Sequence, residues 1–128
     1  MGVPTLHETD VEELDIPGRR LRWLVAEDRL KASHCSACVI RIAPGDKVRP
    51  AHSHPEGEEV IYIVTGSGRV LVDGEVSPVR AGSAVLFPQG KPHMLDNTGS
   101  DEMKVVCFFA TATSLANYKI HETVDFPD

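Results

Sequence analysis

Short apolar runs separated by turn-forming residues occupy most of the chain between residues 21 and 110. Each run is rich in β-branched or aromatic residues and is bounded by Gly, Pro, Asn or Asp, which is typical of β-strands. The sequence Asp73-Gly74 lies between two such runs and predicts a two-residue hairpin turn. The runs predict eight strands, over residues 21–26, 37–42, 60–65, 69–72, 75–79, 84–87, 93–95 and 103–110.

Several of these runs are apolar at nearly every position, which predicts strands with both faces covered. Together with the scarcity of helical patterns, this predicts an all-β sandwich or barrel in one domain, residues 1–128. Residues 1–20 are polar and mixed and read as an N-terminal extension, with a short helical turn over 10–14 capped by Thr9 or Asp10. Residues 111–128 form a polar tail that we expect to cover a sheet edge or to contact a partner subunit.

Composition excludes several classes of partner. The net charge of −6, with 19 acidic and 13 basic residues, argues against nucleic-acid binding, which needs a basic surface. No apolar run approaches the roughly 20 residues of a membrane helix. The first ten residues lack the charged and apolar regions of a secretory signal, so a cytoplasmic location is expected.

The three cysteines have a less specific pattern. Cys35 and Cys38 form a CxxC pair, which can bind zinc or undergo redox chemistry. Here the pair enters an apolar strand, where positions 35 and 38 point to opposite faces, and no helix start follows it. We therefore expect small, reduced filler residues, with Cys107 buried in its own strand.

The candidate chemistry lies in two separate stretches. His52 and His54 are two positions apart, so on a strand both imidazoles project from one face. Glu58 and Glu59 follow a turn, and alternation lets only one of them face as the histidines do. His93 begins a later strand. Three imidazoles and one carboxylate suit one divalent transition metal, among Fe, Mn, Ni, Co, Cu and Zn.

Around these residues the chain resembles the cupin family. The first family motif corresponds to Gly45, His52, His54, Glu59 and Gly66, with one extra residue between Gly45 and His52. The second motif corresponds at every fixed position, to Gly82, Pro88, Gly90, His93 and Asn97. The resemblance covers residues 37–110.

The resemblance implies a jelly-roll barrel, also called a double-stranded β-helix, that is often homodimeric. It also implies metal ligands at His52, His54, Glu59 and His93. The spacing to Gly66 favours Glu59 over Glu58. Glu58, or Glu56 beside it, is the candidate for catalytic proton transfer. Asn97 is expected to form hydrogen bonds at a turn rather than to bind the metal.

Such a site predicts a metal-dependent enzyme that acts on a small molecule chelating the ion through two oxygens. A dioxygenase-type oxidoreductase is the first expectation, and an isomerase, cyclase or lyase the second. A module that binds a metal or small ligand without turnover is the alternative from another class, because this fold hosts many functions.

Overall fold

The computed structural model describes residues 2–128. Its strands are β1 Leu14–Ile16, β2 Arg19–Val25, β3 Ser36–Ile42, β4 His52–Ser53, β5 Glu59–Thr65, β6 Ser67–Val72, β7 Glu75–Arg80, β8 Ala84–Phe87, β9 His93–Asp96, β10 Met103–Phe109 and β11 Lys119–Ile120. Two short 3-10 helices are η1 Glu8–Asp10 and η2 Leu115–Asn117. All eight predicted strands are present; β1, β4 and β11 carried too short a signal to be predicted.

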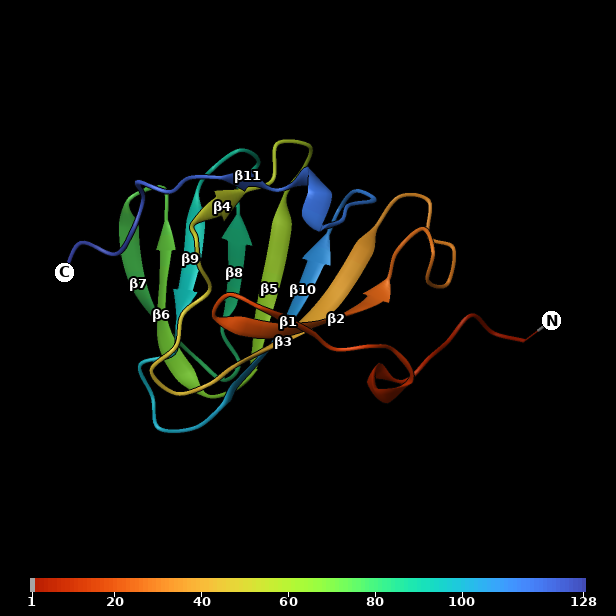
Figure 1. The fold of residues 1–128 in the computed structure, drawn as a ribbon, viewed down its shortest axis with the longest axis horizontal. Helices are drawn as coiled ribbons and strands as arrows, with labels where there is room; N and C mark the ends of the chain where they lie inside the picture. Colours follow the sequence, from red (N-terminus) through yellow and green to blue (C-terminus); the bar gives the residue numbers. More distant parts are fainter. Residues whose placement is uncertain (1) are drawn as a thin grey trace.

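The strands form two antiparallel sheets that face each other (Figure 1). The six-stranded sheet has the order β1-β2-β3-β10-β5-β8, and the five-stranded sheet has the order β11-β4-β9-β6-β7. Neighbouring strands are mostly far apart in sequence, as in the β10–β3 and β6–β9 pairs. This is the architecture expected of a jelly-roll barrel.

The core lies between the sheets and follows from alternation within the strands. In β5, Ile61 and Ile63 are 1% and 0% exposed, whereas Tyr62 between them is 51% exposed. Opposite them on β10, Val105 and Cys107 are buried in the same core. Alternation in β5 therefore turns Ile61 and Ile63 inward and Tyr62 outward.

Turn residues fix the ends of the strands. Asp73 and Gly74 both have positive φ, +48° and +85°, as a tight hairpin between β6 and β7 requires. Gly66 has φ +90°, and a Cβ there would lie 2.8 Å from the Cα of Met103. Only glycine satisfies both constraints without moving the backbone.

The helical turn near the N-terminus differs from the prediction. It spans Glu8–Asp10 rather than 10–14, and its cap is His7, not Thr9 or Asp10. The His7 imidazole accepts a hydrogen bond from the backbone N–H of Thr9, while the Asp10 carboxylate accepts one from the backbone N–H of His7. The cap was missed because histidine rarely takes this role.

The C-terminal tail packs on its own subunit. It crosses the end of the barrel, where β11 pairs with β4, and continues along the five-stranded sheet (Figure 1). His121 Nε2 lies 2.8 Å from Ser53 Oγ. Phe126 is 6% exposed and packs with Ala51, Leu71 and Met94. The tail is therefore part of the fold.

The three cysteines are free thiols. Cys38 and Cys107 are directly opposite each other on β3 and β10 and are 1% and 3% exposed, whereas Cys35 precedes β3 and is only half-buried. The predicted burial of Cys107 is confirmed. Over residues 2–128 the structure contains no helix long and apolar enough to cross a membrane.

Candidate metal centre

Three histidines meet inside one end of the barrel. His52 lies on β4 and His54 directly follows that strand, so both imidazoles turn inward while Ser53 turns outward to the tail. His93 begins β9 and is paired with His52 across the two strands. The proximity of His52 and His93, 41 positions apart in sequence, is a product of this strand pairing.

The three imidazoles are arranged as a ligand cluster. One nitrogen from each of His52, His54 and His93 lies within 4.8 Å of the others. Each of these residues is at most 6% exposed.

Glu59 enters this cluster from the opposite sheet. It begins β5, is 4% exposed, and places Oε1 2.8 Å from His54 Nε2 and 3.3 Å from His93 Nε2. Two ligands bound at about 2.1 Å and at right angles lie about 3 Å apart, which matches both contacts.

Backbone carbonyls orient two of the imidazoles. Nδ1 of His52 lies 3.3 Å from the carbonyl of Pro50, and Nδ1 of His93 lies 3.1 Å from the carbonyl of Lys91. A carbonyl only accepts, so each Nδ1 carries the hydrogen and each Nε2 keeps a lone pair directed inward. This is the usual way that proteins prepare histidine for a metal.

The electrostatics affect the protonation of His52 and Glu59. Burial, reinforced by His93 and Arg19, holds the pKa of His52 well below its ordinary value, so this imidazole is neutral near pH 7. Burial alone would raise the pKa of Glu59, but its contacts with His54 and His93 lower it to about 2. Neutral imidazoles and an ionised carboxylate are the forms that bind divalent metals.

Several buried atoms of the cluster lack hydrogen-bond partners. They include His54 Nε2, His93 Nε2 and Glu59 Oε1. Buried polar atoms are rarely left unpaired, and here they point toward one another. The donor set therefore fits a divalent transition metal held by the three histidines with Glu59 as a fourth ligand.

Aromatic side chains enclose the cluster. Phe87 stacks on His93 with ring centroids 3.8 Å apart, and Phe109 meets His54 edge-on at 4.9 Å. Tyr118, from the tail, stacks on His52 at 4.8 Å and meets His54 edge-on at 4.4 Å. Sequence reasoning missed Tyr118, because nothing in residues 111–128 signals contact with residues 52–54.

A small cavity of about 30 Å³ adjoins the ligands. Its walls are mainly apolar and include Ile61, Phe87 and Leu95, with His52 and Glu59 at its polar end. This volume holds about one or two water molecules. A larger substrate would therefore have to reach the metal ligands from outside this cavity.

Glu58 is not part of this cluster. Its side chain is exposed, one position out of phase with Glu59, and its backbone carbonyl accepts from the N–H of Ala110 at 3.3 Å. Asn97, as expected, lies outside the ligand cluster and forms hydrogen bonds instead.

The family model for the cupin domain matches residues 38–109. The chain is 34% identical over 97 residues to protein SchB of Streptomyces halstedii, covering 72% of this chain and 70% of that protein. It is 32% identical over 101 residues to polyketide synthase CurC of Streptomyces cyaneus, covering 76% of this chain. The chain spans 64% of the length of CurC and 45% of uncharacterized protein MJ1618 of Methanocaldococcus jannaschii.

Solved structures share the fold at lower identity. Oxalate decarboxylase from Lactobacillus farciminis, in a formate complex, superposes with a TM-score of 0.78 at 24% identity, covering 87% of this chain and 35% of that one. The polyketide cyclase RemF from Streptomyces resistomycificus superposes with a TM-score of 0.75 at 21% identity, covering 93% of this chain and 85% of that one. With two antiparallel sheets, a three-histidine cluster and the match over residues 38–109, the chain belongs to the cupin family.

Proposed function

We propose that this protein is a metal-dependent enzyme that acts on a small substrate bound to the ion through two oxygen atoms. The observation that carries the proposal is the convergence of buried polar atoms of His54, His93 and Glu59 that have no hydrogen-bond partner. A purely structural cluster would be hydrogen-bonded internally. Four protein ligands also leave positions for a substrate, unlike a closed structural site.

The ion would supply Lewis-acid stabilisation of negative charge on a substrate oxygen. The residues of the chain would provide the rest. Burial raises the pKa of Tyr118 far above its ordinary value, so its phenol stays protonated and can donate a hydrogen bond to a substrate beside His52. Glu58 remains a proposed proton-transfer residue only if its exposed side chain turns toward the substrate.

We favour a reaction in which the substrate undergoes no net oxidation. The names of the relatives support it: a polyketide synthase protein, a polyketide cyclase and an oxalate decarboxylase. Cyclisation, isomerisation and decarboxylation all proceed through enolate-like or carbanionic states that a Lewis acid stabilises. This preference reverses the order expected from the sequence, where a dioxygenase came first.

A dioxygenase remains the second candidate. The observation in its favour is the apolar cavity of about 30 Å³ beside His52, Glu59 and His93. Its size and walls suit a diatomic gas better than a polar substrate.

Metal analysis followed by two assays tests the proposal. Purified protein, or protein reconstituted with Fe, Mn, Ni or Zn, should contain about one ion per chain. Product analysis with diketones, catechols, hydroxyacids and oxalate should then reveal cyclised, isomerised or decarboxylated products without oxygen uptake. Oxygen uptake would instead select the dioxygenase. Absence of metal after every reconstitution would refute the proposal, and metal without turnover of any compound would favour the binding module.

We also propose that the protein is a homodimer. The outer face of the six-stranded sheet carries neighbouring exposed apolar side chains, each 37–51% exposed: Val60, Tyr62, Val64, Leu86, Val106 and Phe108. Phe108 lies opposite Val60, and Val60 lies opposite Leu86, so the patch runs continuously across three strands. A twofold axis through such a patch would bury it against itself.

A further inference from the structure

Arg19 occupies an unusual position for an arginine. It begins β2, where alternation places it on the same face as Leu21, which is 1% exposed in the core. Its neighbour Arg20 lies on the opposite face and is exposed. Arg19 is half-buried, and an arginine on a core-facing position usually has a carboxylate partner.

No such partner is present for Arg19 in the part of the chain that the structure describes. Six of the eight arginines have a carboxylate within 4.0 Å: Arg20, Arg22, Arg29, Arg41, Arg49 and Arg69. Arg80 has none but is exposed to water. Within residues 2–128, Arg19 is therefore a half-buried cation with no carboxylate close enough to compensate its charge.

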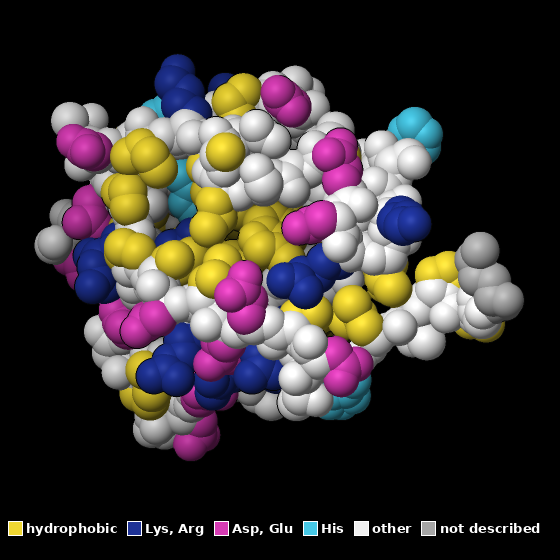
Figure 2. All heavy atoms as spheres, turned by 45° about the vertical axis from the view of Figure 1, so that its right-hand side comes forward, with side chains coloured by type: hydrophobic (Ala, Val, Ile, Leu, Met, Phe, Trp, Pro, Cys, Tyr) yellow, Lys and Arg dark blue, Asp and Glu magenta, His cyan; other side chains and the backbone are white. Residues whose placement is uncertain are grey.

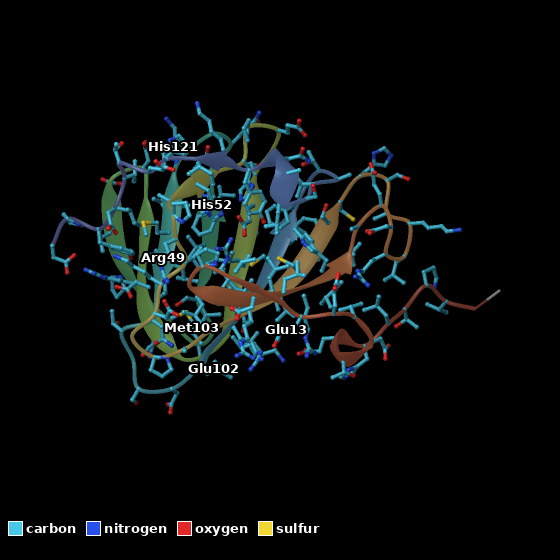
Figure 3. All side chains as sticks on the ribbon, in the orientation of Figure 1. Glu13, Arg49, His52, Glu102, Met103 and His121 are labelled. Carbon is cyan, nitrogen blue, oxygen red and sulfur yellow. The ribbon has the colours of Figure 1, made fainter. Side chains whose placement is uncertain are left out.

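The hydrogen bonds of Arg19 leave most of its donors free. Nη1 donates to the carbonyl of Pro17 at 3.0 Å and to that of Arg49 at 3.5 Å. Within residues 2–128, Nε and Nη2 have no protein acceptor. Arg49 lies on the segment that leads into His52 (Figure 3), so this contact holds the guanidinium beside the approach to the metal ligands.

The charge of Arg19 also acts on the site. Burial lowers the pKa of Arg19, and the negative forms of Tyr118 and Glu59 oppose that effect. Coulombic effects of this kind fall off with distance, so they agree with a guanidinium that lies near Tyr118 and Glu59. Figure 2 shows a hollow lined by hydrophobic side chains, with both basic and acidic side chains at its border.

We propose that Arg19 binds a carboxylate of the substrate, while other oxygens of the same substrate face His52, His54, His93 and Glu59. This inference rests on the proposed function and narrows its substrate class to anions that chelate a metal and carry a further carboxylate. The free Nε and Nη2 donors present the two parallel N–H groups that match a carboxylate. An anion there would also compensate the unpaired charge.

A purely structural role is the competing explanation, because Nη1 connects Pro17 to Arg49. If Arg19 has only that role, replacing it should lower the free energy of unfolding. It should then change the affinity for charged and less charged ligands equally. Ligand selectivity therefore separates the two explanations.

The test compares two hydroxyacids on metal-loaded protein, malate and 2-hydroxybutyrate. Both chelate through a hydroxyl and a carboxylate, but only malate has a second carboxylate. The variants are Arg19→Gln, Arg19→Lys and the matched control Arg20→Gln, which removes the same charge from the exposed face. Dissociation constants come from calorimetry, and metal content is measured on each sample.

Wild type should bind malate more tightly than 2-hydroxybutyrate. Arg19→Gln should weaken malate roughly 10- to 100-fold, as expected for lost charge-assisted hydrogen bonds, and leave 2-hydroxybutyrate nearly unchanged. Arg19→Lys should fall between, and Arg20→Gln should match wild type. Equal affinities of wild type for both acids, or equal losses of both in Arg19→Gln, would overturn the role of Arg19. Wild type that fails to hold metal would instead refute the proposed function.

Discussion

Replacing Asn97 with alanine should lower the stability of the fold and leave metal binding intact. Asn97 is fully buried at the end of β9. Its amide nitrogen donates to the carbonyls of Ile42 at 2.8 Å and Asp101 at 2.9 Å, and its amide oxygen accepts from the backbone N–H of Gly99 at 3.0 Å. The side chain therefore ties the end of β3 to the loop that follows β9.

These contacts set the expected size of the effect. The bond to Ile42 is fully buried, so its carbonyl would lose its partner at a cost of about 1–3 kcal/mol. The bonds to Asp101 and Gly99 are partly buried, so water can replace them and each contributes about 0.5–1 kcal/mol. Asn97→Ala should lower the free energy of unfolding by about 3 kcal/mol and Tm by roughly 10 °C in a chain of this size.

Urea denaturation of the metal-free protein measures the change in the free energy of unfolding. Metal analysis of the folded variant measures whether it still binds the ion. The matched control is Asn117→Ala, which loses only an exposed contact of 3.5 Å to Thr113 and should change stability by less than about 0.5 kcal/mol. Folded Asn97→Ala should still hold about one ion per chain. An unchanged unfolding midpoint, or loss of metal without loss of stability, would refute a structural role.

The remaining predictions concern the site and the assembly. His93→Ala should abolish metal binding while Cys35→Ala retains it; equal metal content in both variants would reject the ligand assignment. Tyr118→Phe keeps the ring on His52 but removes the hydroxyl, so it should lower kcat roughly 10- to 100-fold with metal content unchanged; full activity would exclude the hydrogen bond from Tyr118 to the substrate. Phe108→Lys, in the exposed apolar patch, should give a folded monomer in sedimentation; a monomeric wild type would contradict the dimer.

Much of this architecture was predictable because it depends on local pattern. Alternation and turn residues gave eight strands and the inward face of β5. The glycine at position 66 was predictable for the same reason, since a positive φ beside Met103 tolerates little else. The choice of Glu59 over Glu58 followed from motif spacing, and the structure places Glu59 inside and Glu58 outside.

Features that depend on distant contacts were not predictable. Strand β4 has only two residues and is defined by its neighbours β9 and β11. The approach of Tyr118 to His52 depends on the path of the tail over the barrel end, which no local pattern encodes. Arg19 lies close in sequence to Arg20 and Arg22, and among residues 2–128 the lack of a carboxylate partner is what distinguishes it from them.

The four candidate metal ligands come from both sheets of the barrel. His52 and His93 belong to the five-stranded sheet, whereas Glu59 begins β5 of the six-stranded sheet. An ion held by all of them would join the two sheets at one end of the barrel, where they would otherwise be linked by apolar packing and by the tail. Because such an ion binds the folded state and not the unfolded chain, its binding free energy adds to stability. Such an ion would therefore offset the electrostatic cost of an ionised, buried carboxylate whose partners are imidazoles rather than arginines; Glu59 is only 4% exposed.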